Sequence, residues 1–175
     1  YNAHPEETLI LVTADHETGG LALGCKEMHY ESNLGIIDHQ KCSGDAFTTI
    51  LGNYFKENDR DASFEGVMEL VSEYFGLGEE IPLSDDEVVL LKKAYAEAMG
   101  GNNAKPDKMI YGAYNLITAC CTKLISQKAG AGWTSNSHTA SPVPVRVIGP
   151  GAEKFSSFTD NTDLPRMMEE IMGIK

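Results

Sequence analysis

Asp15, His16 and Glu17 stand side by side, directly after a run of apolar and β-branched residues at 8–14. Carboxylate oxygen and imidazole nitrogen are good ligands for zinc. The apolar run lacks helical spacing, which is typical of a strand buried on both faces in a parallel sheet. Ligands of open α/β sheets bind beyond the carboxyl ends of such strands, where these side chains lie. A turn at the glycines that follow would let Asp15 and His16 face one ion.

Asp15 and His16 together could contribute to a pair of divalent ions about 4 Å apart, which clamps the attacking and leaving oxygens of a phosphoryl transfer. Such ions also neutralise charge on the transferring phosphoryl group, which is where most of the catalysis lies. The residues alone leave a second interpretation open, in which Asp15 and His16 are a hydrogen-bonded pair at a strand end.

Four stretches of the chain carry a family resemblance. Residues 8–20 resemble the strand-and-loop signature Val-Thr-Ala-Asp-His-Glu-Thr-Gly-Gly of bacterial alkaline phosphatases. Residues 132–140, which read Gly-Trp-Thr-Ser-Asn-Ser-His-Thr-Ala, are similar to that family's second metal-binding stretch, and residues 143–155 are similar to the strand and loop after it. Residues 160–163, Asp-Asn-Thr-Asp, are similar to the family's closing segment. Because the four matches keep the family's order, the resemblance frames nearly the whole chain, although residues 30–125 share only its general character.

The resemblance implies a two-zinc phosphomonoesterase that works through a phosphorylated serine. It assigns Asp15 and His16 to the zinc beside the serine, and His138 to the other zinc, which activates the leaving group and later the water. Glu17 and Asn136 do not carry over as ligands, but either could orient a histidine. Asn136 stands where family members often have another histidine, and a further departure is an alanine in place of the glycine after His138-Thr139.

The family's other catalytic groups have no counterpart in this sequence. The nucleophilic serine, the phosphate-binding arginine, the remaining zinc ligands and the magnesium ligands all lie upstream of the segment that matches residues 8–20. We therefore expect residues 1–175 to be the C-terminal portion of one alkaline-phosphatase-like domain. Such a chain would need the N-terminal part of the enzyme as its partner and would be inactive alone. Each zinc would keep at most two protein ligands of the four that a tetrahedral site prefers.

Charge and hydropathy limit the function classes. The formal net charge of -12 argues against binding to nucleic acid or to anionic lipid. No apolar run approaches the roughly 20 residues that span a bilayer, and the chain has no basic, apolar start like that of a signal peptide. Residues 1–5 instead look like a helix tail and loop entered partway. The family resemblance suggests a periplasmic or extracellular enzyme, and it leaves a homodimer of the intact enzyme open.

The periodicity of apolar residues predicts strands at both ends of the chain around a helical middle. We expect a short strand at 21–23 beside the first strand, an edge strand around 143–148, and helices at about 45–55, 64–75, 85–99, 108–129 and 163–172. Helix starts at Ser63 and Ser84 carry capping residues, and Ser84 with Glu87 forms a capping box. The predicted fold class is α/β, a partial sheet of an alkaline-phosphatase-like sandwich with a helical insertion at about 45–129.

The other cysteines and histidines have ordinary interpretations. Cys120 and Cys121 lie in an apolar helical stretch and are expected to be core thiols. Cys25 and Cys42 could form a disulfide if the protein is exported. His4, His29 and His39 lack neighbours at metal-ligand spacing, which favours surface histidines.

Two alternatives to a phosphate monoesterase remain open. The chain could be a binding module with a phosphatase-like shell and no catalysis. Related metal hydrolases also act on phosphodiesters or sulfates through similar metal sites. The Asp-His-Glu-Thr-Gly-Gly stretch at 15–20, the Gly-Trp-Thr at 132–134 and the closing segment together favour phosphate monoesters as substrates.

Overall fold

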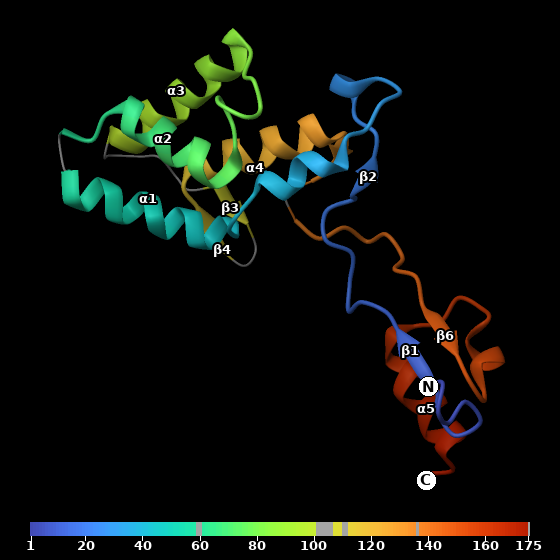
Figure 1. Ribbon diagram of the computed structural model, residues 1–175. Coiled ribbons are helices and arrows are strands. Elements are labelled where there is room, and N and C mark those ends of the chain that lie inside the picture. Colours follow the sequence, from blue (N-terminus) through green and yellow to red (C-terminus); the bar gives the residue numbers. More distant parts are fainter. Residues whose placement is uncertain (59–60, 101–106, 110–111, 136, 175) are drawn as a thin grey trace. The chain divides into compact units, whose positions relative to one another are not determined.

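A computed structural model describes residues 1–58, 61–100, 107–109, 112–135 and 137–174 of the chain (Figure 1). The chain forms two compact units. The terminal unit joins both chain ends, Tyr1–Gly20 and His138–Lys175, and the central unit is Leu21–Ser137. All three predicted metal ligands therefore belong to the terminal unit.

The terminal unit is built on two short strands and one helix. Strand β1 (Ile10–Val12) pairs antiparallel with β6 (Arg146–Ile148), with Leu11 opposite Val147. The 3-10 turns Ala152–Phe155 and Asn161–Asp163 follow, and then helix α5 (Leu164–Met172). Helix α5 and strand β6 both agree with the prediction. Strand β6 begins at Arg146, after Pro142 and Pro144, because proline has no N–H to donate to a sheet ladder.

The expectation for the first strand is wrong in two respects. Among the residues that the structure describes, its partner β6 is antiparallel rather than parallel, and the strand is not buried on both faces, since Ile10 is 38% exposed and Val12 is 60% exposed. Two parallel strands run in the same direction and need a long crossover connection between them. Strand β6 instead runs in the direction opposite to β1. The apolar run correctly predicts a strand, but it does not predict whether the neighbouring strand is parallel or antiparallel.

The central unit contains the second correction. Strand β2 (Ala22–Leu23) pairs with β5 (Ala131–Gly132), and not with the first strand as predicted. The 3-10 turns Lys26–Met28 and Leu34–His39 follow β2. The backbone N–H of Gly24 donates to the carbonyl of Gly130 at 2.6 Å, which extends this pairing to the end of the last helix of the unit. The short apolar segment at 21–23 therefore pairs with residues near the other end of the central unit.

Three predicted helices of the central unit are confirmed: α1 (Gly44–Asn58), α2 (Phe64–Phe75) and α3 (Asp85–Met99). The Ser63 side chain accepts a hydrogen bond from the N–H of Gly66 at the start of α2. Ser84 and Glu87 form the complete capping box at the start of α3. These side chains satisfy N–H groups that have no partner within the helix, which is why the helices begin there.

The fourth helix starts later than predicted. Strands β3 (Asp107–Met109) and β4 (Gly112–Tyr114) form an antiparallel pair where the helix was expected, and α4 runs only over Leu116–Ala129. The Asn115 side chain accepts from the N–H of Ile117, which makes Asn115 the helix cap. Most of the predicted polar turn at 102–107 lies outside the described residues. The helical insertion is therefore interrupted by a hairpin.

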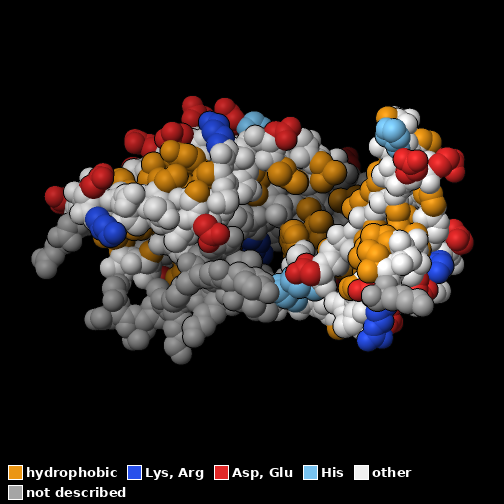
Figure 2. All heavy atoms as spheres, turned by 90° about the horizontal axis from the view of Figure 1, so that it is seen from below, with side chains coloured by type: hydrophobic (Ala, Val, Ile, Leu, Met, Phe, Trp, Pro, Cys, Tyr) orange, Lys and Arg blue, Asp and Glu red, His pale blue; other side chains and the backbone are white. Residues whose placement is uncertain are grey.

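The hydrophobic core lies in the central unit. Its buried members come mainly from the four helices, namely Phe47, Leu51, Val67, Val71, Phe75, Leu77, Ile81, Leu91, Ile117, Cys121, Leu124 and Ile125. Large hydrophobic side chains also reach the surface, and Figure 2 shows them in patches between acidic side chains on one face. Among the residues that the structure describes, no helix has the length and apolar character to cross a membrane.

The cysteines are all free thiols. Cys121 is buried in the core and Cys120 packs against it, as predicted. Burial raises the pKa of Cys121 well above the usual range, which keeps this thiol protonated and unreactive. The disulfide considered for Cys25 and Cys42 is not formed, and the Cys25 thiol instead donates to the carbonyl of Gln127. The mixture of helices and strands agrees with an α/β class, whereas the sandwich remains a prediction.

Candidate functional site

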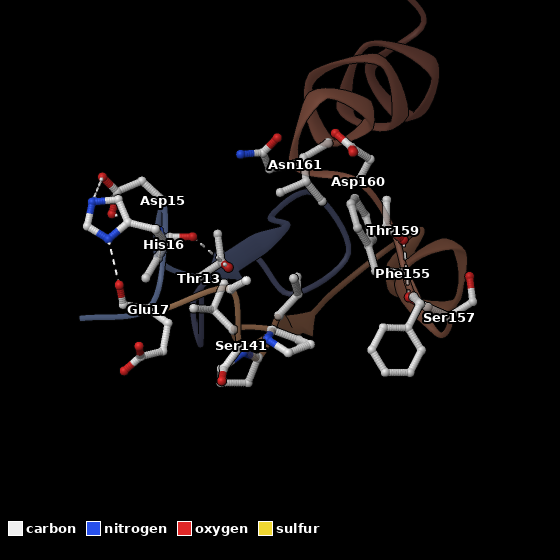
Figure 3. Close-up of a pocket in the computed structure, with 18 of the residues that line it drawn as sticks. Thr13, Asp15, His16, Glu17, Ser141, Phe155, Ser157, Thr159, Asp160 and Asn161 are labelled. Carbon is white, nitrogen blue, oxygen red and sulfur yellow. Dashed lines mark hydrogen bonds and ion pairs between the residues drawn. The ribbon is translucent and has the colours of Figure 1, made fainter. Parts of the chain in front are cut away.

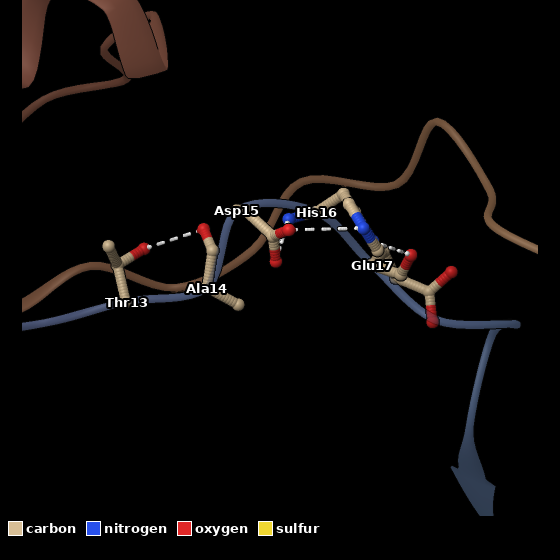
Figure 4. A network of polar contacts seen from close by, with 5 residues as sticks. All are labelled: Thr13, Ala14, Asp15, His16 and Glu17. Carbon is tan, nitrogen blue, oxygen red and sulfur yellow. Dashed lines mark hydrogen bonds and ion pairs between the residues drawn. The ribbon is translucent and has the colours of Figure 1, made fainter. Parts of the chain in front are cut away.

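In the loop after β1, the Asp15 carboxylate lies next to a ring nitrogen of His16 (Figure 4). Asp15 Oδ2 lies 3.2 Å from His16 Nε2. The other carboxylate oxygen, Oδ1, accepts a hydrogen bond from the backbone N–H of His16 at 3.1 Å. The backbone therefore orients the carboxylate, and one oxygen remains directed at the ring.

The second ring nitrogen of His16 is engaged by the backbone. His16 Nδ1 lies 2.9 Å from the carbonyl oxygen of Glu17. A carbonyl oxygen can only accept, so Nδ1 must carry the hydrogen, and Nε2 is the nitrogen that faces Asp15. A metal-binding histidine commonly donates its other N–H in this way.

His138 joins this pair from the other end of the chain. Its ring stacks on the ring of His16, with centroids 3.6 Å apart and planes 30° from parallel. The fold thus brings together the three residues that the sequence singled out. Within the described ranges, however, no group of three or more His, Cys, Asp or Glu side chains converges on one point that could hold a metal ion. The side chains are adjacent, but they do not form a closed three-ligand cage.

The donor types and one spacing fit zinc. Two ligands about 2.0–2.2 Å from a tetrahedral zinc lie roughly 3.3–3.5 Å apart. The 3.2 Å separation of Asp15 Oδ2 and His16 Nε2 is close to that ligand-to-ligand distance. The expected role of Asp15 and His16 on a single ion is therefore compatible with their positions.

Glu17 holds the loop rather than facing the ring pair. Its carboxylate accepts hydrogen bonds from the N–H groups of Gly19, Gly20 and Thr139 and from the Thr139 hydroxyl. These bonds, with that from the Thr139 side chain as the largest, lower the pKa of Glu17 to about 2. Glu17 also supplies the carbonyl that orients His16, which fits the orienting role considered from the sequence. Asn136, the other candidate for that role, lies outside the described residues.

A cleft of about 740 Å³ opens beside these residues within the terminal unit. Asp15, His16 and Glu17 line one side, while Phe155 and the segment 156–161 line the other (Figure 3). The far wall is mixed, with the hydroxyl and amide groups of Ser156, Ser157, Thr159 and Asn161 beside the rings of Phe155 and Phe158. The sequence marked residues 160–163 only as a family segment, and nothing in their spacing predicted that they would face the Asp15 loop.

Asp160 has a local structural role in that wall. Its carboxylate accepts from the hydroxyl and the N–H of Thr162, and these bonds lower the pKa of Asp160. The bond to the Thr162 N–H caps the 3-10 turn at Asn161–Asp163. The sequence offers Thr162 or Asp163 as the cap of the following helix, and Asp163 is the N-cap residue of α5, although its side chain makes no capping hydrogen bond.

The remaining histidines lie apart from the His16–His138 pair. His4 is exposed and lies 3.7 Å from Glu7, and His39 pairs with Glu80 at 2.5 Å. His29 is exposed, at the end of the Lys26–Met28 turn. These positions agree with their interpretation as ordinary histidines.

Comparisons with known proteins point to one family. The family model for alkaline phosphatase matches residues 2–174. Alkaline phosphatase 4 of Bacillus subtilis (strain 168) is 26% identical over 170 residues, which is 95% of this chain and 30% of that protein. Alkaline phosphatase 3 of the same organism is 24% identical over 166 residues, covering 92% of this chain and 29% of that protein.

Solved structures show a similar fold. The crystal structure of a cold-active alkaline phosphatase from a psychrophilic Shewanella sp. superposes with a TM-score of 0.62 at 24% identity, covering 98% of this chain and 35% of that one. The alkaline phosphatase of Thermus thermophilus gives a TM-score of 0.60 at 22% identity, with 99% and 35% coverage. The chain spans about a third of the length of the relatives it matches.

Proposed function

The chain belongs to the alkaline phosphatase family, and from this premise we propose that it supplies part of a two-zinc site that hydrolyses phosphate monoesters. The observation that carries the proposal is the meeting of Asp15, His16 and His138, with the two imidazole rings stacked 3.6 Å apart. Two segments from opposite ends of the chain thus place two nitrogen ligands and one carboxylate in a single patch.

Asp15 and His16 would hold one zinc, and His138 would contribute to the other. The Asp15–His16 spacing of 3.2 Å supports a shared ion for the first two residues. Zinc bound here would act as a Lewis acid toward the phosphoryl oxygens and would stabilise the attacking and leaving oxygens. The chain's own contribution is orientation, since the Glu17 carbonyl fixes the tautomer of His16 and the His16 N–H fixes the Asp15 carboxylate. The magnesium ligands of the family have no counterpart in this chain.

The proposed site is completed by another part of the enzyme. The family's nucleophilic serine, its phosphate-binding arginine and the remaining zinc ligands would come from the N-terminal part, which would also complete the sandwich. Residues 1–175 alone would then bind zinc weakly and leave phosphate esters intact. The proposal includes a periplasmic or extracellular location and a homodimer of the intact enzyme, both from the family resemblance.

The test is zinc-supplemented hydrolysis of an aryl phosphate by two proteins. One is residues 1–175, and the other is the full-length product of the gene that encodes them. We expect no turnover by residues 1–175 and turnover by the gene product that falls by at least about 100-fold with His138→Ala, a loss in the range reported for removing a key electrostatic group. His4→Ala is the matched control, because His4 is exposed in the same unit.

Other results would support a different function. Turnover of phosphodiesters or sulfate esters in preference to monoesters would favour a related metal hydrolase. A gene product that binds phosphate esters without hydrolysing any of them would indicate a binding module. His138-dependent turnover by residues 1–175 would contradict the proposed division of the site.

A further inference from the structure

The Glu17 carboxylate joins the two ligand-bearing segments, because it accepts hydrogen bonds from both of them. The N–H of Gly19 donates to both carboxylate oxygens at 2.8 Å, and the N–H of Gly20 donates to Oε1 at 2.5 Å. From the other segment, Thr139 donates its N–H to Oε2 at 3.2 Å and its hydroxyl to the same oxygen. Thr139 directly follows His138, and Glu17 directly follows His16.

The turn after Glu17 is shaped to receive this carboxylate. Gly19 has a φ of 137° and Gly20 a φ of 68°, a region that side-chain-bearing residues rarely adopt. Successive N–H groups in such a turn form a concave anion-binding nest. Here the anion is supplied by the chain itself. The carboxylate is anchored by the nest on one side, so its Oε2 is presented at a fixed position to Thr139.

Both oxygens of the carboxylate are occupied by hydrogen bonds from the chain. An ionised carboxylate offers about four lone-pair positions. Oε1 accepts from Gly19 and Gly20, and Oε2 accepts from Gly19 and twice from Thr139. Glu17 therefore acts on the ring pair through its neighbours and not as a ligand.

We propose that Glu17 is a positioning residue that, through Thr139, holds the His138 ring against the His16 ring and so pre-organises the metal ligands. The inference rests on the proposed function for its metal-binding consequence, whereas the positioning itself is a property of the chain. Both histidines are adjacent in sequence to a residue of this link, so we expect loss of the link to loosen the two loops that carry the rings.

The first arm of the test measures the link without metal. In the chain, amide hydrogen exchange is followed at Gly19, Gly20 and Thr139, and the nuclear Overhauser effect is measured between the rings of His16 and His138. We expect Glu17→Gln to speed exchange at these amides by about tenfold or more and to abolish the ring contact, because the amide group places an N–H₂ against N–H donors. Glu153→Gln makes the same charge change at an exposed position of the same unit and should alter neither.

A pair of variants at Thr139 isolates the hydroxyl bond. Thr139→Val keeps the shape and removes the donor, and Thr139→Ser keeps the donor. We expect Thr139→Val to loosen the ring pair, as Glu17→Gln does, and Thr139→Ser to retain it. Because each variant leaves the other half of the link in place, this comparison remains informative if Glu17→Gln fails to fold.

The second arm measures Co²⁺ affinity from the visible absorption of the bound ion. Glu17→Gln and Thr139→Val should weaken binding about 10–100-fold, the usual cost of losing a group that orients metal ligands. Thr139→Ser and Glu153→Gln should bind like the wild type. Unchanged exchange, ring contact and Co²⁺ affinity in Glu17→Gln would overturn the inference. If neither residues 1–175 nor the full-length gene product binds Co²⁺, the proposed function fails, while the first arm still decides whether Glu17 positions the rings.

Discussion

At His16, the backbone decides which ring nitrogen is available for chemistry. The Glu17 carbonyl engages Nδ1, so Nε2 is the nitrogen turned toward Asp15. Any metal ion that uses Asp15 and His16 together must therefore bind Nε2. This detail depends on the local turn, and the residue types in the sequence do not reveal it.

Gly149 is a second residue whose backbone supports the site, since it lies directly after β6. Its φ is 116°, and a Cβ added there would meet the carbonyl oxygen of Thr8 well inside van der Waals contact. We expect Gly149→Ala to destabilise the terminal unit by clearly more than the roughly 1–2 kcal/mol that an unfavourable positive φ costs by itself. The measurement is denaturant unfolding of the chain, monitored by amide hydrogen exchange at the residues of β1 and β6.

Gly173→Ala is the matched control for Gly149→Ala. Gly173 also has a positive φ, 67°, but open space surrounds the position of its Cβ. This variant should cost only the conformational strain. Equal effects of the two substitutions would contradict the account of close approach between β6 and the segment before β1.

At the scale of elements, caps and spacing predicted helices better than strands. The boundaries of α2 and α3 follow from Ser63 and Ser84, whose side chains bond the first turn of each helix. Strand pairing was missed at β1 and β2, because an apolar run of a few residues carries no record of its partner. The apolar spacing before α4 resembled a helix, whereas Asn115 caps the helix only after a hairpin.

The capping box of α3 also links two helices. Glu87 receives the N–H of Ser84 at 2.7 Å and the Lys128 ammonium, from α4, at 2.9 Å. Burial is the largest influence and raises the pKa of Glu87, but the bonds from Ser84 and the ion pair with Lys128 together lower it below its ordinary value of 4.5. The folded state thus favours the charged carboxylate.

This shift predicts how the stability of the central unit depends on pH. A lowered pKa contributes stability that is fully present above pH 4.5 and is lost as the pH falls through the lowered value. Glu87→Gln should therefore reduce the free energy of unfolding by about 1–2 kcal/mol at pH 7, typical for loss of a cap. The difference from wild type should shrink below pH 4.5 in chemical denaturation. Glu97→Gln, at an exposed pair in the same helix, should change stability by less than about 1 kcal/mol at either pH.

At the scale of the whole molecule, the candidate site and the main core belong to different units. The helices of the central unit bury the core, whereas the terminal unit gathers the metal-competent side chains from both ends of the chain. The sequence singles out Asp15, His16 and His138 by their residue types and motifs, and the structure brings the three side chains together, whereas their role as metal ligands stays a prediction. The link through Glu17 and Thr139 could not be predicted, because it depends on two distant loops meeting.

The most direct test of the central claim is a zinc titration of the chain observed in a nitrogen–proton correlation spectrum of the histidine rings. All five histidines report at once, so His4, His29 and His39 serve as internal controls. We predict that zinc shifts the ring signals of His16 and His138 first, with His16 bound through Nε2 and still protonated at Nδ1. Equal shifts of the ring signals of all five histidines would contradict the assignment of this site. Unchanged ring signals of His16 and His138 would contradict it as well.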